Sequence, residues 1–354
     1  MIRKTRNTLI IAICILLAVE IGLQVRSQIR YGQSVFNAIS AETTYIHDPV
    51  TGLKLLRPNH RIEGSQATIV TNALGLRDEP LPEIKPEDEF RIAIVGASTV
   101  MGTYTRNNQD TLSYRLQAIL NKQTAKPRTR VINAGIAGYS LNEQRRIIEQ
   151  ILALHSVDQY VLYPGFNDLG VYCRNNTDSV GKESYALPAL ELPSWLLTTE
   201  LISKNTVNLR SSVAQNSSLV DPNTLDTKVF EDDMAGLAAT LKATGRPVLV
   251  VGNSWAFRRG MSNDQRIKLS ESARYYKSCF DTDGLETLFE NHNRIIERMA
   301  VSHGLGYFDL QEKLPGGSRY FGDSSHFSIY GTRRVAEIVA DQITGNKPLP
   351  MVQE

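Results

Sequence analysis

The chain has 354 residues, enough for one large domain with appendages or for two domains of ordinary size. Hydrophobic residues make up 42% and charged residues 21%, proportions that exclude a disordered, collagen-like or multi-span membrane protein. The 39 Lys and Arg residues nearly balance 37 Asp and Glu residues, giving a formal net charge of +2 with no long basic stretch. The composition therefore gives no support for nucleic-acid binding.

An apolar segment near the N-terminus predicts a membrane anchor. Arg3, Lys4 and Arg6 precede a run from Leu9 to Val19 that has no polar side chain. A helix from Thr8 to Val25 would span about 27 Å, close to the thickness of the hydrocarbon layer. The positive charges predict a cytoplasmic N-terminus and an extracytoplasmic remainder, periplasmic in a Gram-negative cell. A cleaved signal peptide is the alternative, but no small-x-small cleavage site follows the apolar run.

The chain divides into four regions by composition and pattern. We take residues 1–30 as a cytoplasmic tip and transmembrane anchor, and residues 31–88 as a polar stalk with a small N-terminal extension. Turn signals and short apolar pieces mix after Asp48, which predicts an irregular β-containing structure. The main domain is expected over residues 89–345, with a C-terminal tail at 346–354.

Strand and helix patterns alternate within the main domain. Strands are predicted at residues 90–96, 130–135, 159–165, 247–252 and 306–310, and helices at 111–121, 141–154, 227–243, 285–303 and 329–343. This alternation predicts a parallel, doubly wound, three-layer α/β domain. Two connections that follow strands, about 167–225 and 253–283, are too long for simple turns. In open parallel sheets ligands bind beyond the carboxyl ends of the strands, so these insertions should shape a substrate cleft.

The first three strands each end in residues that suit nucleophilic catalysis. Ser98 follows the first strand in Gly-Ala-Ser-Thr, where a nucleophile would be exposed at the sheet edge. The second strand ends in Asn-Ala-Gly-Ile-Ala-Gly (133–138), with two candidate glycines, and Asn167 follows the third strand; a glycine N–H or an asparagine amide can donate to a developing oxyanion. Each piece alone is also an ordinary turn. The complete phosphate-loop and dinucleotide-binding patterns are absent from the serine block.

An Asp and a His lie close together just before the last predicted helix. Asp323 precedes His326 by three residues. Across a turn, this spacing lets the carboxylate reach one ring nitrogen while the other stays free for a serine proton. A helix-cap carboxylate beside a structural histidine is the alternative for the isolated pair.

The four blocks together resemble those of the SGNH hydrolases, also called the GDSL esterase and lipase superfamily, over about residues 90–345. The resemblance implies a flavodoxin-like α/β/α domain with a five-stranded parallel sheet of order 2-1-3-4-5. It also implies a catalytic triad in which Ser98 is the nucleophile, His326 is the general base and then acid, and Asp323 orients the imidazole. The implied oxyanion hole consists of the backbone N–H groups of Ser98 and Gly138 and the side-chain amide of Asn167.

One position departs from the family pattern. The usual Gly-Asp-Ser-Leu reads Gly96-Ala97-Ser98-Thr99, so Ala97 stands where the family has an aspartate. None of the roles above needs that carboxylate, but its loss keeps a non-catalytic protein open as an alternative.

The resemblance implies a serine ester hydrolase that acts through an acyl-serine intermediate with no metal or organic cofactor. An anchor, a turn-rich extension and a hydrolase domain resemble members associated with bacterial cell-envelope polysaccharides. An O-acetylated carbohydrate is therefore the expected substrate, with water or a sugar hydroxyl as acceptor. The expected partners are this substrate, the envelope polysaccharide machinery and the bilayer, through residues 8–25. The alternatives are a lysophospholipase or lipase and a non-catalytic glycan-binding or scaffold protein.

The three cysteines allow at most one bridge. Cys14 lies in the apolar segment, whereas Cys173 and Cys279 lie in the two long connections. In the strand order that the resemblance implies, these connections leave neighbouring strands. We predict a disulfide between Cys173 and Cys279 in an oxidising compartment, with two unpaired buried cysteines as the alternative.

Overall fold

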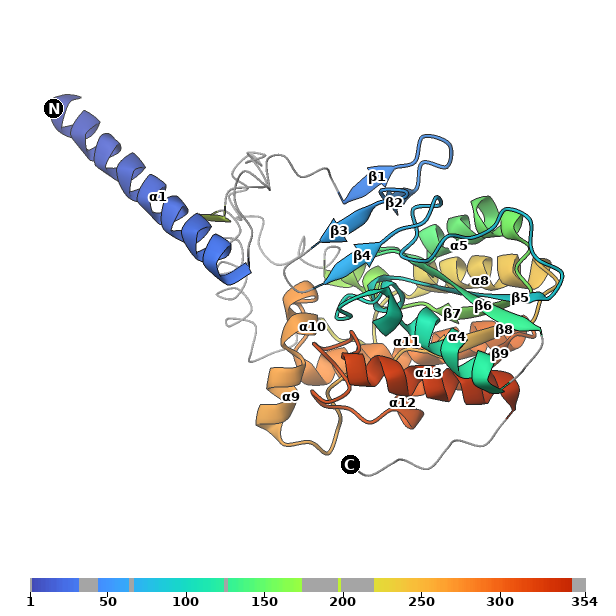
Figure 1. Ribbon diagram of the computed structural model, residues 1–354. Helices are drawn as coiled ribbons and strands as arrows, with labels where there is room; N and C mark the ends of the chain where they lie inside the picture. Colours follow the sequence, from blue (N-terminus) through green and yellow to red (C-terminus); the bar gives the residue numbers. More distant parts are fainter. Residues whose placement is uncertain are drawn as a thin grey trace.

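The computed structural model describes residues 2–31, 44–63, 67–123, 127–173, 197–198 and 220–345. Five of the strands are β5 (Glu89–Gly96), β6 (Arg128–Gly135), β7 (Gln159–Tyr163), β8 (Val248–Gly252) and β9 (Gly306–Asp309). They form one parallel sheet in the order β6-β5-β7-β8-β9, which confirms the predicted order 2-1-3-4-5 (Figure 1). Gly96 at the end of β5 pairs with Gly135 of β6 and with Tyr163 of β7. The residues that follow these three strands therefore meet at one edge of the sheet.

Helices cover both faces of this sheet (Figure 1). The helices are α4 (Leu112–Gln123) and α13 (Ile329–Thr344) on one face, and α5 (Leu141–Gln150), α8 (Lys228–Ala243) and α11 (Thr282–Ser302) on the other. Along β5, Ile92 and Ile94 pack against the face covered by α4 and α13, whereas Ala93 and Val95 pack against the opposite face. A strand segment buried on both faces carries apolar side chains at successive positions, which explains the run from Ile92 to Val95. The three-layer architecture is confirmed.

Several element ends differ by a few residues from the sequence prediction, and two of the differences have a clear structural description. The strand predicted to reach residue 165 ends at Tyr163, because Pro164 has no N–H to donate and Gly165 turns the chain with a φ of 83°. The helix predicted over residues 141–154 ends at Gln150 and continues as the 3₁₀ helix η2 (Leu152–His155).

The β-containing part of the N-terminal extension consists of two short hairpins. β1 (Tyr45–His47) pairs with β2 (Lys54–Leu56), and β3 (Arg61–Glu63) pairs with β4 (Thr68–Val70), both antiparallel. Each strand has three residues. Isolated hairpins of this length are marginal in water, so they depend on packing against the main domain.

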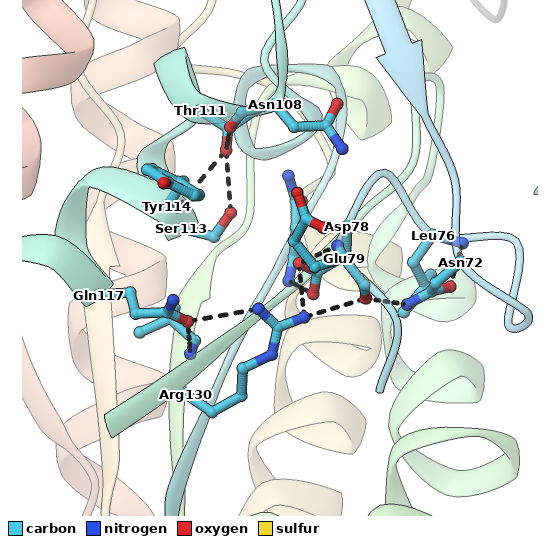
Figure 2. Close-up of polar contacts among 12 residues, drawn as sticks. Asn72, Leu76, Asp78, Glu79, Asn108, Thr111, Ser113, Tyr114, Gln117 and Arg130 are labelled. Atoms are coloured by element: carbon cyan, nitrogen blue, oxygen red, sulfur yellow. Dashed lines mark hydrogen bonds and ion pairs between the residues drawn. The ribbon is translucent and has the colours of Figure 1, made fainter. Parts of the chain in front are cut away.

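A polar network fastens the extension to the edge strand β6 (Figure 2). Arg130 donates from Nη2 to Oδ1 of Asp78 at 2.9 Å and to the carbonyl of Glu79 at 3.0 Å. The backbone N–H of Asn133 donates to the other carboxylate oxygen of Asp78 at 3.1 Å. Burial raises the pKa of Asp78 to about 6, although Arg130 and the Asn133 N–H favour the ionised form. The extension thereby covers part of an edge strand that would otherwise expose its backbone.

The N-terminal helix α1 (Ile2–Tyr31) contains the predicted apolar segment. Residues Arg6–Arg26, 21 in all, are long and apolar enough to cross a membrane, a property that a signal sequence shares. The predicted stalk beyond Tyr31, most of the first insertion and the C-terminal tail lie outside the described residues. The second insertion contains two short helices, α9 (Asn263–Leu269) and α10 (Glu271–Tyr276).

Candidate active site

The predicted serine, histidine and aspartate lie in one hydrogen-bonded row. Ser98 Oγ is 2.8 Å from His326 Nε2, and His326 Nδ1 is 2.7 Å from Asp323 Oδ2. Because an ionised carboxylate only accepts, Nδ1 carries the proton and Nε2 is left to accept from the Ser98 hydroxyl. This is the tautomer that a general base needs in order to activate a serine.

The turn after β5 holds Ser98 at the carboxyl edge of the sheet. Ser98 begins the short helix α3 (Ser98–Met101), which Gly102 ends with a φ of 90°. Gly96 has no room for a side chain, since a Cβ there would lie 2.4 Å from the Val100 side chain and 2.6 Å from the Tyr163 carbonyl. The glycine lets the chain turn sharply from strand to helix with Ser98 at the point of the turn.

A closed loop before α13 positions the other two residues. It follows the short helix α12 (Leu310–Lys313). The Gly322 N–H donates to the His326 carbonyl at 2.9 Å. Asp323 Oδ1 accepts from the backbone N–H groups of Ser325 and His326, each at 2.9 Å. The carboxylate therefore fixes the loop with one oxygen and the imidazole with the other.

The carboxylate of Asp323 is kept ionised by its surroundings. Burial alone would raise the pKa of Asp323, but the bonds from the His326 ring and from two backbone N–H groups hold it below its ordinary value. Tyr104 donates its hydroxyl to Asp323 Oδ2 at 3.2 Å, and its ring lies 5.9 Å from the His326 ring. Burial raises the pKa of Tyr104 to about 12, so it remains a neutral donor. No sequence pattern singled out Tyr104, because it lies 219 residues before its partner.

A cavity of about 470 Å³ opens beside this row, lined among others by Ser98, Gly138, Asn167 and His326. Gly138 has a φ of 88°, a backbone conformation that residues with a side chain rarely adopt. Gly135, the other glycine of this block, is packed at the strand end, where a Cβ would lie 2.3 Å from the Met101 nitrogen. Of the two glycines, Gly138 is the one at the cavity, as the resemblance implied.

Asn167 is held by one of its two amide hydrogens. It begins the 3₁₀ helix η3 (Asn167–Gly170), and its Nδ2 donates to the Tyr139 carbonyl at 2.9 Å. That contact uses one N–H and leaves the amide a second one for a ligand. The neighbouring Asp168 accepts from the Leu141 N–H with both oxygens at 3.2 Å, which ties the turn after β7 to the start of α5.

Asn253 supports the same turn from the next strand and was not foreseen from the sequence. Its Oδ1 accepts from the Gly165 N–H and its Nδ2 donates to the Gly165 carbonyl, both at 2.9 Å. Asn293 in α11 repeats the arrangement on the backbone of Asn253, at 2.9 and 2.8 Å. A chain of paired amides therefore fixes the turn that carries Asn167.

Ala97 is buried at 3% exposure and contributes only a methyl group to the cavity wall. That methyl would lie 3.6 Å from a Cβ placed on Gly165. The contacts that hold Ser98, His326 and Asp323 do not involve the side chain at position 97.

The two cysteines of the long connections are joined in the structure. Cys173 and Cys279 form a disulfide across 106 residues, with their Cα atoms 5.4 Å apart. Cys14 is free and exposed. The bond joins the first connection to the end of the second, next to the cavity wall.

A larger groove of about 920 Å³ adjoins the first cavity and shares Ser272, Tyr276 and Asp323 with it. Tyr104 and Tyr276 form part of its wall and are 43% and 72% exposed. Its other lining residues include four charged side chains, namely those of Asp264, Lys268, Glu271 and Arg274. The groove is therefore aromatic and charged rather than uniformly apolar.

No protein-family model matches the chain, and no curated protein matches it. Several solved structures are similar to it. A lipase/acylhydrolase from Enterococcus faecalis has 14% sequence identity and a TM-score of 0.44, covering 74% of this chain and 100% of that one. An acetyl xylan esterase variant from Geobacillus stearothermophilus has 13% identity and a TM-score of 0.44, with 77% and 100% covered. A GDSL-like lipase from Bacteroides thetaiotaomicron has 11% identity and a TM-score of 0.40, with 72% and 88% covered. Values this low leave the function to be judged from the site itself.

Proposed function

We propose that this chain is a membrane-anchored serine ester hydrolase of the SGNH type that acts on an O-acetylated carbohydrate of the cell envelope or of an extracellular polysaccharide. The observation that carries the proposal is the unbroken row Ser98, His326 and Asp323, at 2.8 and 2.7 Å, on the wall of a cavity that also holds three candidate oxyanion donors. A partly buried Ser-His-Asp row of this kind, open to a cavity, is typical of a catalytic site.

In the proposed reaction Ser98 Oγ attacks the ester carbonyl while His326 Nε2 takes its proton. Asp323 stabilises the imidazolium that forms. The backbone N–H groups of Ser98 and Gly138 and the second N–H of Asn167 stabilise the oxyanion. His326 returns the proton to the leaving alcohol, and water then releases the acid from the acyl-serine. A sugar hydroxyl in place of water makes the same site an acyltransferase.

The character of the adjoining groove is compatible with a carbohydrate. Exposed tyrosine rings beside charged side chains give a surface that can contact the faces and hydroxyls of a sugar. A lysophospholipase or lipase is the alternative, and it would need an apolar path for an acyl chain. The groove also carries the apolar side chains of Ile267, Leu269 and Phe321, so its lining does not decide between the two, and the substrate comparison described below does.

The helix α1 is the proposed membrane anchor of the chain. Its 21-residue apolar part is about 30 Å long at 1.5 Å per residue, enough to cross a bilayer. We infer a cytoplasmic N-terminus from the basic residues before it. A reporter fused after residue 63 should be active only as an extracytoplasmic reporter, and the protein should stay in membranes after a carbonate wash. A soluble product that begins near residue 26 would instead show cleavage.

A labelling experiment tests the enzymatic proposal. The full chain in detergent should react with a fluorophosphonate probe, because an activated serine reacts and a structural serine does not. Ser98→Ala should abolish labelling, whereas Ser113→Ala, a buried serine of α4, should leave it unchanged. Hydrolysis should then be compared on acetylated xylan, short-chain and long-chain aryl esters and lysophospholipid. Absence of labelling favours the non-catalytic glycan-binding alternative, and preference for lysophospholipid favours the lipase.

A further inference from the structure

Lys277 is a buried cation in the wall of the catalytic cavity. The residue is 7% exposed and lines the same cavity as Ser98 and His326. It follows α10 directly, two residues before Cys279. Neither the sequence motifs nor the proposed reaction uses it.

The surroundings of Lys277 provide no counter-charge within the described part of the chain. Its ammonium makes no hydrogen bond or ion pair there, and it lies over the Phe289 ring, whose centroid is 6.0 Å away. That distance is at the outer limit for a cation–π contact. The nearby His292 is neutral, since its Nδ1–H donates to the Leu288 carbonyl at 2.7 Å and its Nε2 accepts from Tyr172 at 3.1 Å. Burial lowers the pKa of Lys277 to about 8, which leaves the amine largely protonated near pH 7.

Hydrogen bonds and the nearby disulfide fix the backbone of Lys277, so a shift of the loop does not expose the side chain to solvent. Its N–H donates to the Ala273 carbonyl at 2.9 Å, and its carbonyl accepts from the Phe280 N–H at 3.1 Å. The disulfide at Cys279 holds the loop on its other side. A buried ammonium without a partner is costly unless something compensates its charge. The open side of Lys277 is the cavity, so the compensating group is one that enters with the substrate.

We propose that the Lys277 ammonium binds an anionic substituent of the carbohydrate substrate while the acetyl ester of the same substrate lies at Ser98. This inference rests on the proposed function. The acetyl group is uncharged, so the anion belongs to the sugar, as a carboxylate or a phosphate. Lysine is a compact point charge and accepts either geometry, unlike the planar fork of arginine.

The test is the ratio of kcat/KM for an acetylated methyl glucuronoside to that for the matching acetylated methyl glucoside. The wild-type protein should prefer the glucuronoside, and Lys277→Met should reduce the ratio by about tenfold or more, as expected for the loss of a charge-assisted hydrogen bond. Lys277→Arg should keep part of the preference. Lys242→Met, at an exposed lysine of α8, is the matched control and should keep the wild-type ratio. An unchanged ratio in Lys277→Met would overturn the proposal.

A competition experiment on the wild-type protein covers the case in which Lys277→Met does not fold. With a neutral aryl acetate as substrate, glucuronate or glucose 6-phosphate should inhibit at a concentration about tenfold or more below that of glucose. The tighter of the two identifies the anion as carboxylate or phosphate, and equal inhibition by all three sugars contradicts the role of Lys277. Fluorophosphonate labelling distinguishes failure of this inference from failure of the proposed function. A labelled enzyme without anion preference refutes only the inference about Lys277, whereas an unlabelled wild-type chain refutes the proposed function.

Discussion

Arg77 in the N-terminal extension donates from Nη1 to the carbonyl of Gly102 at 2.7 Å, and Gly102 ends the short helix that Ser98 begins. The same guanidinium reaches the carbonyls of Met101 at 3.2 Å and Thr105 at 3.4 Å. Arg77 is 1% exposed. The extension therefore supports the loop that carries the candidate nucleophile.

Arg77→Met should destabilise the fold because it removes the guanidinium hydrogen bonds to three buried carbonyls, of which that of Gly102 still accepts from the N–H and the hydroxyl of Thr105. We expect a loss of about 2 to 4 kcal/mol in the free energy of unfolding and a lower kcat. Urea unfolding of the full chain in detergent measures the first quantity. Arg106→Met in the same loop is the control, since that side chain is 69% exposed and should cost less than about 1 kcal/mol. Equal losses in the two variants would contradict the supporting role.

Asn167→Ala should lower kcat by about 10²-fold to 10³-fold if the amide stabilises the oxyanion, while KM changes much less. Steady-state kinetics on a short-chain aryl ester would separate the two constants. A rise in KM with kcat preserved would mean that Asn167 positions the substrate instead.

Asp168 should make the stability of the fold depend on pH. Burial raises the pKa of Asp168 from 3.8 to about 6, although the Leu141 N–H opposes the shift. A raised pKa means that the folded state favours the protonated carboxyl, so its contribution is present below about pH 4 and is lost as the pH rises through 6. Asp168→Asn cannot ionise. Relative to wild type, its unfolding free energy should rise by on the order of 2 kcal/mol between pH 4 and pH 7. A pH-independent difference would rule this out.

The disulfide should stabilise the fold because it closes a long loop, although the stabilisation grows only with the logarithm of the loop length. For 106 residues the chain-entropy model gives about 4 to 5 kcal/mol, less if the bond is strained. Thiol titration of the unfolded, unreduced protein should find one free thiol per chain, that of Cys14. Three free thiols would exclude the bond in the isolated protein.

The sheet and its helices could be predicted because their signals are local. β5 contains a continuous apolar run from Ile92 to Val95, and helices such as α13 repeat apolar residues on one face. The end of β7 was missed because Pro164 and Gly165 override the apolar pattern. The three-residue strands of the hairpins are too short for a periodic signal, so only their turn residues were visible.

The candidate site was predictable only where short motifs carry it. Ser98, Asp323 and His326 lie in recognisable blocks, and the strand order brings those blocks together. Tyr104 and Lys277 have no such pattern, because their importance comes from contacts with residues far away in the chain. Arg77 resembles any surface arginine in the sequence until folding buries it against the nucleophile loop.

The central claim is that Ser98 and His326 act as one unit, and a double-mutant comparison tests it most directly. Ser98→Ala and His326→Ala should each remove nearly all esterase activity, and the double variant should be little worse than either, because losses within a triad do not add. Asp323→Asn should be somewhat milder. The steady-state hydrolysis rates of one aryl acetate should be compared for the wild-type protein, the two single Ala variants and the double variant. Two separate losses that multiply in the double variant, or a fully active Ser98→Ala protein, would contradict the account.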